Sequence, residues 1–255
     1  MATDEAILRA CRHEGMPPTL RLYGWKKPAV SLGYFQDIDD EIHYEYCLEN
    51  GIDIVRRPTG GRAVLHGDDL TYSLVAEENN RHFSSDIIKT YSTISKCIIR
   101  GLERSGVHAE MVEEGRALNG SVGSFCFAAS YKNELLADGK KICGSAQVRA
   151  KGMFLQHGSI LMDFDPLAVC AAIITKTANP AALETCVTSI RGTLGYTVEM
   201  TDLCRNIKAG FEDVLGIRLI GGELSPEEKA LRDDFLRNKY GNTLCNMGRG
   251  VKVEH

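Results

Sequence analysis

The chain has 255 residues, of which 44% are hydrophobic and 25% are charged. This composition is typical of a soluble globular protein and excludes a disordered or low-complexity chain. Its 30 Lys and Arg against 34 Asp and Glu give a net charge of -4, which is too balanced for a protein whose main task is to bind nucleic acid or anionic lipid.

The apolar runs, the N-terminal stretch and the cysteines indicate the cellular compartment and the state of the thiols. No run approaches the roughly 20 consecutive apolar residues of a membrane-spanning helix. The first stretch, MATDEAILRACRHEG, carries acids where a signal peptide has a basic and then an apolar segment. The nine cysteines contain no CxxC pair, so neither a disulfide framework nor a zinc site is indicated. We expect a cytoplasmic protein with reduced thiols, without a metal, and without nucleic acid or membrane as a partner.

The first part of the chain predicts a short helix and then a sheet. Residues 3–14 have a helical pattern with Thr3 as the N-cap, and Pro17 and Pro18 end it. From residue 84 to 104, apolar side chains recur at helical spacing and indicate a long amphipathic helix. Between these helices, β-branched or alternating runs separated by Gly, Pro and Asp predict strands: TLRLYGW, PAVSLGYF, IDIVRR, RAVLH and LTYSLVA.

The second part continues the sheet and then becomes helical. EEGRALNGSVGS predicts a loop, and the Asp138-Gly139 pair predicts a hairpin between two of the strands that continue to residue 164. Helices are expected after Pro166, from Met200 to Val214, and from Ser225 onward. We predict an α/β (α+β) fold with a mixed sheet flanked by helices. Residues 1–165 form its mainly β catalytic core, 166–245 a helical portion of the same domain, and 246–255 a tail.

The stretch RRPTGGRAVLH, which ends at His66, is the most unusual in the chain. Paired Gly60 and Gly61 between two strands let backbone amides approach a ligand, while Arg57 and Arg62 place positive charge beside it. This combination suits an anionic or carbonyl-bearing substrate. A hairpin whose glycines serve only the turn, with its arginines in solvent, explains the pattern equally well.

A second stretch of interest is GKKICGSAQ, residues 139–147. Small residues here leave room for a ligand to lie on the strand. A solvated hairpin lysine is the alternative interpretation of Lys141. Strand alternation predicts two faces, one with Lys141, Cys143 and Ser145 and the other with Ile142, Gly144 and Ala146.

Together, RRPTGGRAVLH, LTYSLV, GKKICGSAQVR and LQHGSIL resemble, in order and spacing, the core of the biotin/lipoate protein ligase and octanoyltransferase superfamily. The resemblance implies a mixed sheet with helices packed on it and a medium-chain acyl group beside the glycine turn. It also implies transfer of that group to a lysine of a small carrier domain. Family members carry a strand and a loop before the stretch matched by MATDEAIL, so we expect either a start placed too late or a missing edge strand.

Two chemistries compete within this superfamily. Lipoate–protein ligases activate a free acid with ATP, whereas cysteine-dependent octanoyltransferases hold the acyl group as an enzyme thioester. FCFAASYKNELLADGKKICGSA resembles the second kind, so Cys126 takes the nucleophile's position and Lys141 the lysine's. Ala129-Ser130 stands where the family has Pro-Ser. Lys132-Asn133-Glu134 is similar to an Arg-Asn-Asp of the ligases, which keeps the ATP-dependent alternative open.

The resemblance also implies a set of substrate-binding residues around this pair. We interpret Cys143 as a packed structural thiol, and His66 and His157 as pocket-lining residues rather than bases. The substrate-binding residues are Arg57, Gly60, Gly61, Arg62, His66, Tyr72, Gly144, Ser145, Ala146, His157 and Gly158.

The mechanism expected from the resemblance is ping-pong acyl transfer. The ammonium of Lys141 favours the thiolate of Cys126, which takes the octanoyl group and passes it to a lysine amine. The donor is acyl carrier protein or octanoylated glycine-cleavage H protein. The acceptor is a lipoyl domain of H protein or of a 2-oxoacid dehydrogenase E2 subunit. No cofactor is needed for this mechanism. ATP and Mg are required only in the ligase alternative. We expect a monomer, and a non-catalytic binder of lipoyl domains is the third alternative.

Overall fold

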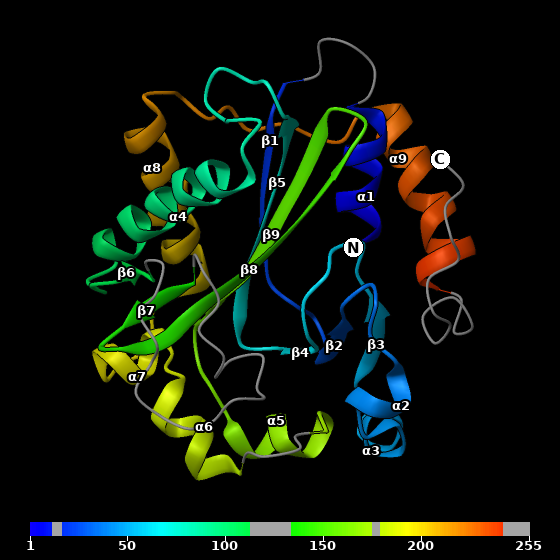
Figure 1. Cartoon of the computed structure of the whole chain (residues 1–255), viewed down its shortest axis with the longest axis vertical. Helices are drawn as coiled ribbons and strands as arrows, with labels where there is room; N and C mark the ends of the chain where they lie inside the picture. Colours follow the sequence, from blue (N-terminus) through cyan, green and yellow to red (C-terminus); the bar gives the residue numbers. More distant parts are fainter. Residues whose placement is uncertain (12–16, 113–133, 175–178, 242–255) are drawn as a thin grey trace.

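The computed structural model describes residues 1–11, 17–112, 134–174 and 179–241 (Figure 1). Its centre is a six-stranded sheet in which every pairing is antiparallel. The long strands β5, β9 and β8 lie in its middle. In sheet order the strands are β1 (Thr19–Tyr23), β5 (Asp69–Glu77), β9 (Met153–Leu161), β8 (Lys140–Ala150), β7 (Leu135–Ala137) and β6 (Glu110–Met111).

A separate three-stranded sheet has the order β3-β2-β4, with β2 parallel to β3 and antiparallel to β4. The helices α2, α3, α5 and α6 lie around it, and a core that includes Val30, Leu32 and Leu183 joins them to the sheet. The elements are β2 (Ala29–Leu32), β3 (Asp53–Arg56), β4 (Val64–His66), α2 (Ile38–Glu41), α3 (Tyr44–Glu49), α5 (Pro166–Ala172) and α6 (Pro180–Cys186).

Helices α4 (Ile87–Arg104) and α8 (Met200–Leu215) cover one face of the large sheet, and α7 (Ile190–Leu194) lies near its end (Figure 1). The two long helices approach closely at glycines, since a Cβ on Gly101 would lie 2.6 Å from the Cα of Ile207. The long amphipathic helix predicted from the sequence is confirmed, with Asp86 as its N-cap. None of the helices in the described ranges is both long and apolar enough to cross a membrane.

The other face of the sheet packs against α1 (Ala2–Ala10), which is covered in turn by α9 (Pro226–Phe235) and η1 (Leu236–Tyr240). The predicted start of the first helix is wrong. The helix begins one residue earlier, so Thr3 lies inside it and no side chain caps it. The predicted start of α9 is confirmed, because Ser225 and Glu228 form a reciprocal capping box.

The predicted fold class, a mixed α/β fold flanked by helices, is confirmed. One aspect differs from the expectation of a single sheet, because the strands divide into two sheets. In the described part of the chain, strands end at Leu161 and only helices follow from Pro166. The division into a core, a helical portion and a tail stays a prediction.

Candidate active site

A cavity of about 460 Å³ is bounded by residues of both sheets, together with Met1, Tyr91 of α4 and Glu134. Eleven of the predicted site residues line it: Arg57, Gly60, Gly61, Arg62, His66, Lys141, Gly144, Ser145, Ala146, His157 and Gly158. Tyr72 is not among the lining residues, but its hydroxyl lies 2.6 Å from Ser145 Oγ. Cys126 lies outside the described residues. The structure thus brings most of the predicted set to one place, and their roles stay predictions.

The glycine turn between β3 and β4 is held by a buried arginine. The guanidinium of Arg57 donates to the carbonyl oxygens of Ser31 at 2.8 Å, Gly60 at 3.0 Å and Arg62 at 2.6 Å. Gly61 has φ 93°, which favours glycine. The alternative in which both arginines lie in solvent is wrong for Arg57, which is only 5% exposed.

Lys141 is buried in the cavity wall, with 2% of its surface exposed, and its ammonium forms an ion pair with the carboxylate of Glu134. The alternative of a solvated hairpin lysine is therefore wrong. Gly144 leaves space for this side chain, since a Cβ there would lie 3.0 Å from Lys141 Cε. A buried ion pair is rigid and keeps the positive charge in one position.

The simple alternation predicted for β8 is wrong at its beginning. Leu136 pairs with Lys141 and Leu135 with Cys143, so two residues of β8 advance against one of β7. This is a β-bulge, which changes the direction of side chains locally. As a result Ile142 and Cys143 both join the hydrophobic core while Lys141 lines the cavity.

Cys143 packs as a structural thiol. Burial raises the pKa of its thiol to about 12, so the group is neutral at physiological pH. A neutral buried thiol is a poor nucleophile, which agrees with the interpretation made from the sequence.

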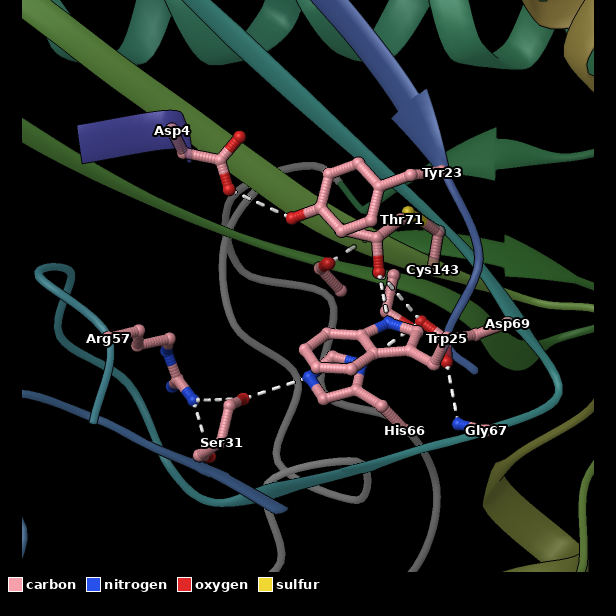
Figure 2. Close-up of polar contacts among 12 residues, drawn as sticks. Asp4, Tyr23, Trp25, Ser31, Arg57, His66, Gly67, Asp69, Thr71 and Cys143 are labelled. Carbon is pink, nitrogen blue, oxygen red and sulfur yellow. Dashed lines mark hydrogen bonds and ion pairs between the residues drawn. The ribbon is translucent and has the colours of Figure 1, made fainter. Parts of the chain in front are cut away.

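A chain of hydrogen bonds runs through the wall formed by the small sheet and β5 (Figure 2). Ser31 Oγ lies 2.8 Å from His66 Nε2, and His66 Nδ1 lies 3.0 Å from Asp69 Oδ2. Burial raises the pKa of Asp69, but hydrogen bonds from His66, Ser159 and Gly67 outweigh it and lower the pKa overall. The carboxylate is therefore ionised at neutral pH.

His157 occupies another part of the cavity wall. Its Nε2 lies 2.6 Å from Thr59 Oγ1, and its Nδ1 has no hydrogen-bond partner among the residues that the structure describes. Burial lowers the pKa of His157 to about 3, so the ring is neutral at physiological pH. The unpartnered Nδ1 is buried within the protein and is a buried polar atom without a hydrogen bond among the described residues.

Comparison with known proteins identifies the family. The profile of the lipoyl protein ligase A/B catalytic domain matches residues 1–212. The chain belongs to this family. Octanoyltransferase LipM of Kyrpidia tusciae is 38% identical over 92% of this chain and 89% of its own length. LipM of Clostridioides difficile is 36% identical, covering 98% and 94%, and LipM of Bacillus subtilis is 35% identical, covering 98% and 93%.

Solved structures of this family share the fold. A crystal structure of lipoate-protein ligase A bound with ATP has a TM-score of 0.81 and 26% identity, covering 97% of this chain and 92% of that one. A bipartite lipoate protein ligase of Thermoplasma acidophilum, described with its E2 lipoyl domain, has a TM-score of 0.82 and 25% identity, covering 100% and 92%. These matches confirm the biotin/lipoate-ligase-like fold class.

Three residues in or beside the cavity wall, Glu134, Asp69 and Ser31, were not predicted from the sequence as site residues. Glu134 was noted only for its likeness to a ligase motif, although hairpin register makes it a diagonal neighbour of Lys141, two residues before Leu136. Asp69 carried a signal as well, because it follows His66 by three residues. Nothing local points to Ser31, which lies 35 positions before His66.

Proposed function

We propose that this chain is an octanoyltransferase that moves a medium-chain acyl group, octanoyl or lipoyl, from a carrier-protein thioester to a lysine of a lipoyl-domain protein. The observation that carries the proposal is the buried Lys141–Glu134 ion pair in the wall of a cavity beside the glycine turn. The relatives named octanoyltransferase, at 35% to 38% identity over nearly the whole chain, support transfer rather than ATP-dependent ligation.

The cavity suits a small acyl group. Its volume of about 460 Å³ falls in the range of roughly 300–1,000 Å³ that is usual for small-molecule sites. Gly158 lets β9 pack closely against its neighbours in this wall, because a Cβ there would lie 2.5 Å from both the Gly144 oxygen and the Tyr72 ring. A larger side chain at 158 would displace these neighbours and change the shape of the cavity.

Cys126 is the proposed nucleophile. Its thiolate attacks the carbonyl carbon of the donor thioester, so one C–S bond forms as another breaks, and the carrier thiolate leaves. The amine of the acceptor lysine then attacks the enzyme thioester, an amide forms and the Cys126 thiolate is released. Because each thioester retains its activation, no ATP is needed.

Lys141 has the role of electrostatic stabiliser in this proposal. An ammonium beside the reacting groups favours a thiolate and the oxyanion of the tetrahedral intermediate. Glu134 holds that ammonium in position and reduces its net field in the cavity. The charge expected from Lys141 is therefore that of one member of a buried ion pair.

The test is incubation of the full chain with octanoyl-acyl carrier protein without ATP, followed by intact mass measurement. A gain of one octanoyl group is expected, and Cys126→Ser abolishes it while Cys204→Ser, a half-buried cysteine of α8, retains it. An adduct formed only with ATP and free acid would support the ligase alternative. No adduct under either condition would support the non-catalytic binder.

The partners and the compartment follow from the same proposal. The donor is acyl carrier protein or octanoylated H protein, and the acceptors are lipoyl domains of H protein or of E2 subunits. A monomeric cytoplasmic enzyme is proposed. Mass measurement on isolated lipoyl domains, with each donor in turn, distinguishes these substrates.

A further inference from the structure

A serine, a histidine and an aspartate are linked by hydrogen bonds in the cavity wall, apart from the Lys141–Glu134 ion pair. Ser31 lies on β2, His66 ends β4 and Asp69 begins β5. The distances are 2.8 Å from Ser31 Oγ to His66 Nε2 and 3.0 Å from His66 Nδ1 to Asp69 Oδ2 (Figure 2). Ser31 and His66 both line the cavity. A nucleophile, a base and a group that orients the base are the components of nucleophilic catalysis.

The neighbours of the series determine the direction of its hydrogen bonds. Arg57 Nη1 lies 3.1 Å from Ser31 Oγ, and a guanidinium can only donate. Ser31 Oγ accepts from Arg57, and at the other end of the series the ionised Asp69 carboxylate can only accept, so His66 Nδ1 carries the hydrogen and donates to it. In the neutral ring Nε2 is then the acceptor, and the Ser31 hydroxyl donates to it. This is the tautomer that a histidine needs to act as a base toward serine.

The base is also held in place from several sides. Asp69 accepts hydrogen bonds from Gly67 N at 3.0 Å, Thr71 Oγ1 at 3.0 Å and Ser159 Oγ at 2.7 Å. Trp25 stacks on the His66 ring with centroids 4.2 Å apart, and Figure 2 shows the indole lying over it. Trp25 Nε1 also donates to Thr71 Oγ1 at 2.8 Å. These contacts fix the position and the tautomer of the imidazole.

We propose that Ser31, His66 and Asp69 form a second nucleophilic centre, which hydrolyses acyl esters and thioesters independently of Cys126. Ser31 Oγ attacks the acyl carbonyl carbon and its proton passes to His66 Nε2. The C–O bond forms, the bond to the leaving thiolate or alkoxide breaks, and His66 protonates the leaving group. Water then attacks the acyl-serine ester with His66 as base, which releases the carboxylic acid and restores the hydroxyl. The Arg57 guanidinium supplies positive charge beside the reacting oxygen.

The experiment uses the full chain with Cys126→Ala, which removes the nucleophile of the proposed transferase. It is treated with an alkyl fluorophosphonate, and the labelled residue is located by peptide mass mapping. In parallel, hydrolysis of p-nitrophenyl octanoate is followed. We expect one label on Ser31 and a hydrolysis rate above that of solvent. Ser31→Ala removes the label and lowers the hydrolysis rate at least about 100-fold. Asp69→Asn also lowers the hydrolysis rate at least about 100-fold.

The matched control is Ser95→Ala, which removes a buried serine of α4 and is expected to leave both readouts unchanged. Folding of each variant is checked by circular dichroism. A folded Cys126→Ala protein that takes no label, or a label that persists in Ser31→Ala, would overturn the proposal. Failure of the octanoyl-carrier assay with Ser31 labelling intact would instead refute the transferase proposal alone.

Discussion

The buried polar groups in the two walls of the cavity are stabilised by different kinds of interaction. On the β8 side an ammonium and a carboxylate, Lys141 and Glu134, neutralise each other. On the side of the small sheet, Ser31 and His66 join Arg57 to Asp69 through a series of directed hydrogen bonds. An ion pair depends on the presence of both charges, whereas a hydrogen-bonded series depends on the position and tautomer of each member. The two walls should therefore respond differently to substitution and to pH.

The largest effect is expected from Lys141→Met. It removes the ammonium that stabilises the reacting groups, so octanoyl transfer should fall at least about 100-fold. It also leaves the Glu134 carboxylate buried without this ammonium, which lowers the free energy of unfolding by about 3–5 kcal/mol. Transfer kinetics and urea denaturation measure the two effects.

The double variant Lys141→Met with Glu134→Gln separates stability from catalysis. It removes both charges of the pair, so most of the lost stability should return while transfer stays low. Recovery of transfer in the double variant would show that the lysine acts only by packing, and the proposed electrostatic role would be wrong.

A smaller effect is expected from Gly158→Ala, which tests the junction between the walls. The added Cβ meets the Gly144 backbone oxygen and the Tyr72 ring at 2.5 Å, so β8 and β9 must move apart. Overpacking of this kind costs about 1–3 kcal/mol. We expect a lower melting temperature and a higher KM for the acyl donor. Gly222→Ala, where nothing lies within 4 Å of the added Cβ, is the control and should change neither.

The smallest effect concerns pH and His157, whose pKa burial lowers to about 3. An unfolded histidine titrates near pH 6.5, so below that value the unfolded state binds more protons than the folded one. Stability from this residue is complete above about pH 6.5 and falls as the pH approaches 3, by about 2 kcal/mol at pH 5. Denaturation of the native chain and of His157→Gln between pH 5 and 7 measures it. The variant should show a flatter profile.

The elements with strong local signals were predictable. The capping box at Ser225 and Glu228 and the apolar repeat of α4 depend on residues near one another in sequence, so local energetics decide them. The hairpin at Asp138-Gly139 was likewise predictable from the sequence, because a positive φ at both positions favours that dipeptide. The motif resemblance added the family and most of the lining residues.

Elements that depend on distant contacts were not predictable in the same way. The first helix extends past its predicted cap because its apolar face packs against β5 and β9. The alternation in β8 fails because a bulge opposite β7 moves two successive side chains into the core. Neither feature is indicated by the local sequence pattern of the residues concerned.

By itself, the sequence determined most of the strands, the first helix, α4, α5, α8 and α9, the glycine turn and the identity of the lysine that enters β8, whereas α2, α3, α6 and α7 were not predicted. Only the tertiary structure decided that Glu134 neutralises Lys141 and that Ser31 meets His66 across 35 positions of chain. The physical reason is that periodicity, caps and turns arise from neighbouring residues. The partner of a buried charge or hydroxyl is instead selected when separate sheets pack together and exclude water from the groups between them.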